Sequence, residues 1–98
     1  MTPIEFLPAA IADLQDIFFH IAQDDVEAAD RMVDRIHAGV ARLLDFPFSG
    51  RTYPDLDDMR GVSITPYIAF YRVTEKGVRI LRVLHGARDL DALFETDD

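Results

Sequence analysis

Arginine and histidine side chains gather toward the C-terminal end of this 98-residue chain. Arg82, His85 and Arg88 follow one another at three-residue steps, and Arg60 lies upstream in the same basic stretch. Guanidinium groups stabilise the charge of a phosphate under attack, and an imidazole can give or take a proton, so this set could cleave RNA through its 2′-hydroxyl. The alternative is structural, because a lone histidine at a strand end is more often packed or solvated than catalytic.

The other polar residues predict no metal or cofactor site. His20 and Asp24 stand one helical turn apart, but two ligands do not make a metal site. Gly86 has no phosphate-loop pattern around it, and the absence of cysteine excludes a thiolate site and a disulfide framework. We therefore expect no metal and no cofactor.

Charge is distributed unevenly along the chain. The net charge is −8, yet residues 59–88 contain six basic residues and one acidic residue, for +5. An acidic chain does not hold nucleic acid by neutralising phosphates, so we expect no direct specific nucleic-acid binding. A basic segment on an acidic protein favours contact with a partner. The candidate target-binding residues are Arg60, Arg72, Arg79, Arg82 and Arg88. Alternatively, these arginines pair with acidic side chains of the helices or of residues 89–98.

The N-terminal half has the spacing of a short strand followed by two helices. Residues 4–6 alternate as in a strand, and Pro8 suits a first helical turn. Apolar residues at three- and four-residue steps predict a helix over roughly 8–23. Asp24 followed by Glu27 resembles a capping box that starts a second helix, whose apolar stripe runs to Leu43. The two helices should form an αα-hairpin.

In the C-terminal half, the spacing of apolar residues changes from that of a helix to that of extended strands. Residues 46–55 carry the proline, glycine and serine of a connecting loop. Strands are expected around 62–64, 67–73 and 78–84, the last two as an antiparallel hairpin closed at Gly77. Adjacent Phe70 and Tyr71 should point to opposite faces, one into the core and the other toward the surface. A short element over 87–94 should pack back on the sheet.

These elements define an α+β fold: an N-terminal strand, an αα-hairpin, then a three-stranded antiparallel sheet with a short C-terminal element. The 49% hydrophobic content of the chain supports one core, so we expect a single domain over residues 1–98. No apolar stretch approaches the ~20 residues that a membrane span requires, and the N-terminus lacks a secretory pattern. We therefore expect a cytoplasmic protein that does not bind membranes.

Several segments resemble the RelE/ParE superfamily of toxins from bacterial type II toxin–antitoxin systems, over nearly the whole chain. The segments that carry the resemblance are Phe6–Leu14, Phe48-Ser49-Gly50-Arg51, Arg60-Gly61-Val62-Ser63, Tyr67–Val73 and Ile80–Asp89. The last of these, Ile-Leu-Arg-Val-Leu-His-Gly-Ala-Arg-Asp, is similar to an ending common in ParE-like toxins. The resemblance implies a helical hairpin across a small antiparallel sheet, and a partner antitoxin that wraps a disordered segment along the toxin.

Two activities are known in this superfamily, ribosome-dependent mRNA cleavage on the RelE side and inhibition of DNA gyrase on the ParE side. An ungapped alignment with RelE-like enzymes places Ile68 where they carry an arginine and Phe94 where they carry a tyrosine. Neither side chain can perform acid–base or cationic catalysis, and Lys76 is the single lysine. The resemblance therefore favours a gyrase inhibitor neutralised by a ParD-like antitoxin over an enzyme. A ribosome-dependent nuclease and a non-toxic relic that only binds antitoxin remain as alternatives.

Antitoxin contacts are expected where apolar or aromatic side chains reach the surface beside the hairpin. The candidates are Ile11, Leu14, Phe18, Arg51 and Tyr71. Helical stripes such as the one formed by Ile11, Leu14 and Phe18 are more often core, which is the alternative for those three.

Overall fold

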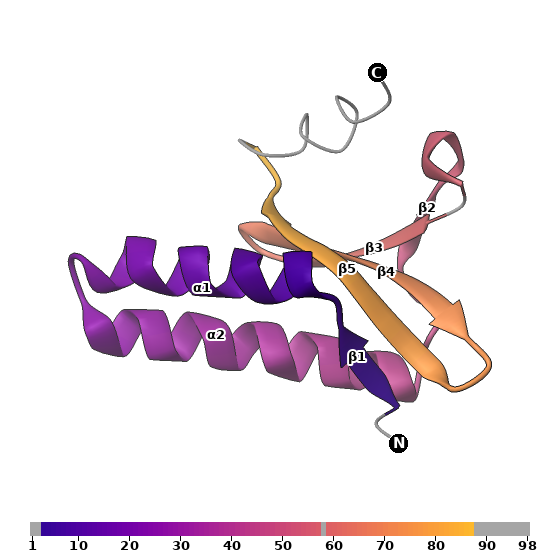
Figure 1. The fold of residues 1–98 in the computed structure, drawn as a ribbon, viewed down its shortest axis with the longest axis horizontal. Coiled ribbons are helices and arrows are strands. Elements are labelled where there is room, and N and C mark those ends of the chain that lie inside the picture. The colour runs from indigo at the N-terminus through magenta and orange to yellow at the C-terminus, as the bar shows by residue number, and fades with distance from the viewer. Residues whose placement is uncertain (1–2, 58, 88–98) are drawn as a thin grey trace.

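Two helices follow a short opening strand and form an antiparallel hairpin (Figure 1). The computed structural model describes residues 3–57 and 59–87, which begin with β1 (Ile4–Phe6), α1 (Pro8–Ala22) and α2 (Val26–Ala41). Pro8 lies in the first turn of α1, where proline's missing N–H costs no hydrogen bond. The expected opening strand and helical hairpin are confirmed.

The start of α2 differs from the predicted capping box. The capping residue is Asp25, whose carboxylate accepts a hydrogen bond from the backbone N–H of Ala28 at 3.1 Å. Glu27 stands in the first helical turn, where its charge is favourable to the helix dipole. The predicted pairing of Asp24 with Glu27 is wrong, because the helix begins one residue later than that pairing requires.

Five strands form one sheet in the order β1-β5-β4-β3-β2. After a 3-10 turn (Arg42–Leu44), the strands are β2 (Arg51–Tyr53), β3 (Met59–Ile64), β4 (Tyr67–Thr74) and β5 (Gly77–His85), with a second 3-10 turn (Pro54–Leu56) after β2. β3, β4 and β5 are antiparallel neighbours, as the sequence predicts. The α+β class is confirmed, with two strands at the edges completing the sheet.

Both edge strands pair in ways that the sequence did not indicate. β1 runs parallel to β5, with Ile4 beside Val78. β2 lies within residues 46–55, where the sequence predicts only a loop, and it runs antiparallel to β3 with Arg51 beside Gly61. β1 and β2 have three residues each, too few to show the alternation of apolar and polar residues by which a strand is recognised.

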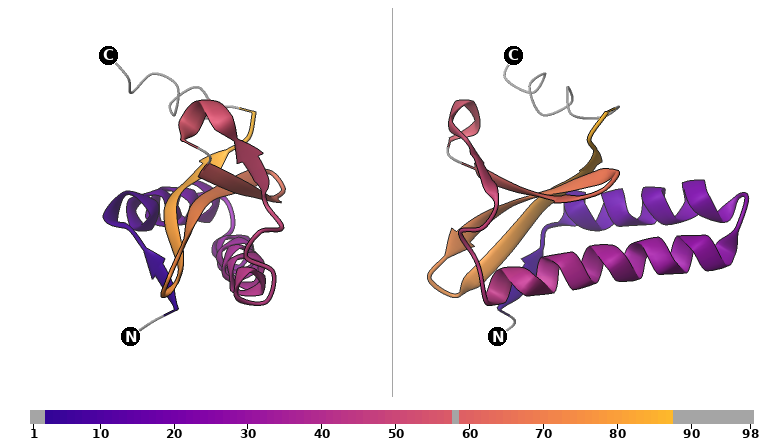
Figure 2. Two further views of the ribbon diagram at one scale, coloured as in Figure 1. Left: turned by 90° about the vertical axis from the view of Figure 1, so that its right-hand side faces the viewer. Right: turned by 180° about the vertical axis from the view of Figure 1, so that it is seen from behind.

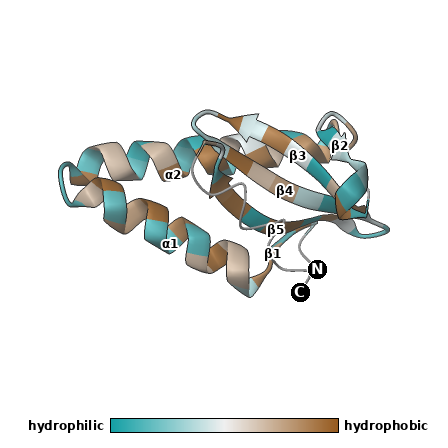
Figure 3. Ribbon diagram, turned by 90° about the horizontal axis from the view of Figure 1, so that it is seen from above, coloured by the Kyte–Doolittle hydropathy of each residue, from teal (hydrophilic) through white to brown (hydrophobic). Residues whose placement is uncertain are grey.

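The main core lies between the helical hairpin and one face of the sheet (Figure 2). The helix α2 buries Ala29, Met32, Ile36 and Val40, close to its predicted stripe. The buried line of α1 instead follows Ala10 and Ile17. The hairpin reaches beyond the sheet (Figure 3), and Ile11 and Phe19 of α1 are exposed.

Phe70 and Tyr71 are both fully buried, at 0% exposure. Tyr71 belongs to the main core, and Phe70 belongs to a smaller cluster with Met59 and Leu84 on the opposite face. A register shift occurs between them, since Phe70 lies beside Arg82 and Tyr71 beside Ile80. The expectation that one of the two reaches the surface is wrong, because the sheet has an apolar cluster on each face. The predicted C-terminal element lies outside the described residues.

Candidate functional site

The strand register separates the residues of the predicted nuclease set. His85 lies beside Tyr67, and Arg60 lies beside Tyr71. These neighbours are four residues apart along β4, or about 13 Å at strand geometry. Arg82 lies beside Phe70 on β5, and its guanidinium pairs with Asp13 of α1. Arg88 lies outside the described residues. Among those described, the fold does not assemble the predicted acid, base and cations.

Arg60 fastens the loop before β2. One guanidinium nitrogen, Nη1, donates hydrogen bonds to the carbonyls of Phe48 at 3.0 Å and Gly50 at 2.9 Å. The guanidinium also lies 5.0 Å from the centre of the Phe48 ring, a distance suited to a cation–π contact. These contacts give Arg60 a structural role.

Arg82 forms the shortest ion pair among the described residues. Its Nε and Nη2 donate to the two carboxylate oxygens of Asp13 at 2.8 and 3.0 Å. The same carboxylate accepts the backbone N–H of Val83 at 2.9 Å. β1 ends beside Ile80, so Asp13 of α1 replaces a strand partner for the next part of β5. The Asp13 side chain is only 12% exposed, which places the pair between helix and sheet.

His85 is also held by its neighbours. Its ring lies edge-on to Tyr67, with 5.6 Å between ring centres. Its Nδ1 accepts a hydrogen bond from the backbone N–H of Ala87 at 3.1 Å. These contacts favour a structural role for His85.

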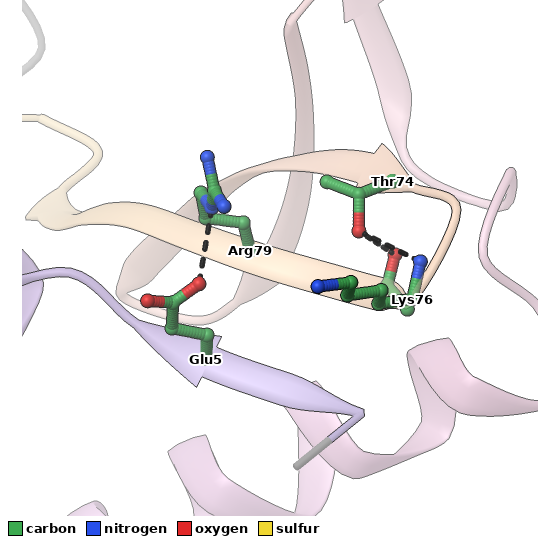
Figure 4. Close-up of polar contacts among 5 residues, drawn as sticks. Glu5, Thr74, Lys76 and Arg79 are labelled. Atoms are coloured by element: carbon green, nitrogen blue, oxygen red, sulfur yellow. Dashed lines mark hydrogen bonds and ion pairs between the residues drawn. The ribbon is translucent and has the colours of Figure 1, made fainter. Parts of the chain in front are cut away.

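Arg72 and Arg79 stand beside each other on β4 and β5 and are more exposed. Arg79 pairs with Glu5 of β1 at 3.1 Å, as Figure 4 shows next to the Thr74–Lys76 turn. Arg72 donates to the carbonyl of Asp57 at 2.8 Å and lies 3.7 Å from its carboxylate. The side chains of Arg72 and Arg79 are 39% and 50% exposed. Exposed ion pairs are weak, so both arginines can exchange these partners for a target.

Tyr71 is wrong as an antitoxin contact, because its side chain is completely buried. Its hydroxyl accepts from the backbone N–H of Gly50 at 2.9 Å and donates to the carbonyl of Pro47 at 2.8 Å. A Cβ on Gly50 would lie 2.5 Å from this hydroxyl oxygen and 2.9 Å from the carbonyl oxygen of Gly61. Gly50 and Tyr71 therefore fix the loop against the sheet.

The other apolar antitoxin candidates share one surface. Ile11, Leu14 and Phe18 line a groove of about 250 Å³ along the outer side of the helical hairpin, which we call the hairpin groove. Phe19 of α1 and Val33 of α2 also line it. Ile11 is 47% exposed and Phe19 is 63% exposed. Arg51 lies elsewhere, on β2, with its guanidinium 5.4 Å from the centre of the Tyr53 ring.

A second groove lies on the opposite flank of α2, against β3. Its apolar lining includes Leu43, Phe46 and Ile64, and its volume is about 470 Å³. Gly39 contributes bare backbone to its wall. A shallower extension reaches Arg35 and Thr65. We call this surface the α2–β3 groove.

Comparison with known proteins identifies the family. A family model described as the ParE toxin of the type II toxin–antitoxin system parDE matches residues 4–90. The chain belongs to the ParE toxin family. It is thus a type II toxin of the wider RelE/ParE superfamily, as the sequence motifs indicate.

Individual relatives of this ParE-family toxin agree in length and fold. It is 34% identical to Toxin ParE3 of Caulobacter vibrioides, with 82% of each chain covered. It is 35% identical to Toxin RelE2 of the same bacterium, over 81% of this chain and 89% of that one. The structure of a chromosomal ParDE TA system from P. aeruginosa superposes with a TM-score of 0.73 and 27% identity, covering 87% of this chain and 96% of that chain.

A basic stripe on α2 of this ParE-family toxin was not predicted from the sequence. Arg31, Arg35 and Arg42 are separated by four and seven residues, which places them on one flank of the helix and its 3-10 extension. All three are exposed. Among residues 3–57 and 59–87, Arg31 and Arg42 have no ion pair or side-chain hydrogen bond. Helical spacing could have revealed this stripe, had charge been counted by helix face rather than by segment.

Neither metal binding nor membrane crossing has a structural basis in the described residues. Within 3–57 and 59–87, no three histidine, aspartate or glutamate side chains lie close enough together to hold a metal ion. None of the helices in this part of the chain has the length and apolar character needed to cross a bilayer.

Proposed function

We propose that this ParE-family toxin inhibits DNA gyrase without catalysing a reaction, and that a ParD-like antitoxin neutralises it. The observation that carries the proposal is the family match together with the separation of His85, Arg60 and Arg82 in the sheet. Each of those side chains is engaged in a contact that supports the fold. Because residues 3–57 and 59–87 contain no assembled nuclease set, the proposed mode of action is binding to the target.

The hairpin groove supports the antitoxin part of the proposal. Ile11, Leu14 and Phe18 offer apolar contacts at helical spacing beside exposed Phe19. An amphipathic helix that folds on binding would bury these side chains in the manner of a helix in a groove. Arg51 remains a candidate for the same partner outside the groove. The superposed structure is that of a ParDE TA system, which supports such a pair.

For the target, Arg72 and Arg79 are the described candidates with exposed guanidinium groups. Arg60 and Arg82 are less suited, since the loop and Asp13 hold them. We expect the Arg72→Ala/Arg79→Ala double variant to inhibit gyrase several-fold less than the unmodified toxin. Lys76→Ala, which removes a neighbouring cation from the turn, serves as the matched control.

The deciding experiment is a supercoiling assay with purified gyrase and toxin, with and without the antitoxin. The proposal expects inhibition that the antitoxin relieves. Supercoiling that proceeds unchanged at toxin excess would refute gyrase as the target and leave the family assignment intact.

A second candidate, mRNA cleavage, is favoured by the likeness to a relative called Toxin RelE2. It would require Arg60, Arg82, His85 and Arg88 to rearrange on the ribosome. Primer extension on translating ribosomes checks it, and the absence of new cut sites would remove it. If, in addition, overexpression without antitoxin leaves growth unchanged, the remaining hypothesis is that the chain is a non-toxic relic that only binds antitoxin.

A further inference from the structure

Polar side chains are scarce in the hairpin groove. Most of the described residues that line it are apolar, and the two polar ones are Gln15 of α1 and His37 of α2. No aspartate, glutamate, lysine or arginine is among these lining residues. His37 is therefore the one described lining residue whose charge can change with pH close to neutrality.

His37 lies where the groove meets the opening strand. The centre of its ring is 5.5 Å from the centre of the Phe6 ring. Phe6 ends β1, which leads into α1 at this end of the helical hairpin (Figure 1). His37 is exposed and makes no ion pair or hydrogen bond within residues 3–57 and 59–87. Water can therefore solvate its protonated form while the groove is empty.

The charged groups around His37 are the same with or without a ligand in the groove. On its own helix, Asp34 precedes it by three residues, close to one helical turn. The titratable residues of α1 are Asp13, Asp16 and His20, and none of them lines the groove. Glu5 of β1 is paired with an arginine of β5. A group that adjoins His37 in both states does not alter the difference between them.

A helix laid in the groove would change the surroundings of His37 by removing water from it. The apolar contacts proposed for the antitoxin, at Ile11, Leu14 and Phe18, line the same groove. Burial among apolar groups disfavours the charged form of histidine and leaves the neutral form less affected. A bound apolar helix thus selects neutral imidazole, and a protonated His37 must give up its proton to the solvent on binding.

We propose that His37 makes antitoxin binding sensitive to acid. The antitoxin helix occupies the hairpin groove with His37 neutral, so binding is strongest above neutral pH and weakens as the pH falls and the imidazole of the free toxin takes up a proton. The inference rests on the proposed pairing with an antitoxin and adds its regulation by pH. Acidification then favours release of the toxin.

Calorimetric titration with the ParD-like product of the neighbouring gene, at about pH 8 and about pH 5.5, spans the range in which imidazole titrates. The dissociation constant of the unmodified toxin should be about tenfold larger at the lower pH. His37→Gln keeps a neutral polar side chain and should change by less than about twofold between the two conditions. His20→Gln is the matched control, because His20 is an exposed histidine of the same hairpin outside the groove, and it should keep the tenfold change.

Proton release on binding is a second measurement, and a mere packing role of His37 would not affect it. Titration at about pH 6.5 in two buffers of different ionisation enthalpy should show about half a proton more released by the unmodified toxin than by His37→Gln. If the antitoxin binds but either the pH profile or the proton release is the same for these two proteins, the acid sensitivity is overturned and the antitoxin pairing stands. Tighter binding of the unmodified toxin at the lower pH would overturn it equally. If the unmodified toxin does not bind the antitoxin even at the higher pH, both are overturned.

Discussion

Asp13 joins α1 to β5 through contacts with both a side chain and a backbone group. One carboxylate serves the guanidinium of Arg82 and the backbone N–H of Val83, and its side chain is 12% exposed. Removing it takes away the carboxylate that Arg82 binds and leaves the backbone N–H of Val83 without this acceptor. A backbone donor that loses its acceptor near the core costs more than the lost hydrogen bond itself.

We predict that Asp13→Ala lowers the free energy of unfolding by about 2 to 3 kcal/mol, measured by urea denaturation. Asp16→Ala is the matched control, because Asp16 lies on the same helix with an exposed side chain and no described ion pair. Its effect should stay within about 0.5 kcal/mol. Equal losses in the two variants would show that the Asp13 contacts add no stability.

The loop between α2 and β2 is the element whose shape depends most on a single side chain. Its carbonyls and N–H groups converge on Tyr71 and Arg60, which reach it from the sheet. The loop presents Phe46 and Phe48 to solvent, at 62% and 65% exposure. Phe46 borders the α2–β3 groove, so fixing the loop also shapes the rim of that groove.

Tyr71→Phe keeps the buried ring and removes only the hydroxyl that joins Gly50 and Pro47. We expect a loss of about 1 to 2 kcal/mol in thermal or urea unfolding, together with faster amide exchange at Gly50. Tyr67→Phe is the control, since its hydroxyl makes no hydrogen bond among the described residues. A Gly50 amide that exchanges at the same rate in both variants would contradict this role of Tyr71.

At the scale of the whole molecule, the N-terminal strand is joined to the last hairpin. The backbone N–H of Val78 donates to the carbonyl of Pro3 at 2.7 Å, and Glu5 pairs with Arg79. Gly77 turns the chain at this junction with φ of +144°, and a Cβ there would overlap the carbonyl group of Pro3. The docking of β1 thus depends on a glycine more than seventy residues away.

Gly77→Ala should therefore separate β1 from β5 and reduce stability by about 2 kcal/mol or more, seen as a lower melting temperature. Gly86→Ala provides the comparison, because a Cβ there would meet its nearest neighbour at an ordinary 3.4 Å. That variant should melt close to the unmodified protein. Similar melting of both variants would mean that β1 can move away from Gly77 without cost.

Only the folded structure shows which charged side chains pair with one another. The basic segment 59–88 suggests a continuous surface for a target, yet Arg60, Arg72, Arg79 and Arg82 are spread over three strands and both sheet faces, each with an internal partner. The unpaired cations of the described chain include Arg31 and Arg42, from the acidic half of the sequence. The acidic partners Asp13 and Glu5 lie some seventy residues from the arginines that they bind, so a segment count cannot find them.

The helical hairpin, the three antiparallel strands and the family can be predicted from the amino-acid sequence, because apolar periodicity, a glycine turn and short motifs are local in the chain. The parallel pairing of β1, the existence of β2, the burial of both Phe70 and Tyr71, and the partner of each arginine are visible only in the folded structure. Those features arise from contacts between residues far apart in sequence, where strands of three residues and single ion pairs leave no periodic pattern to read.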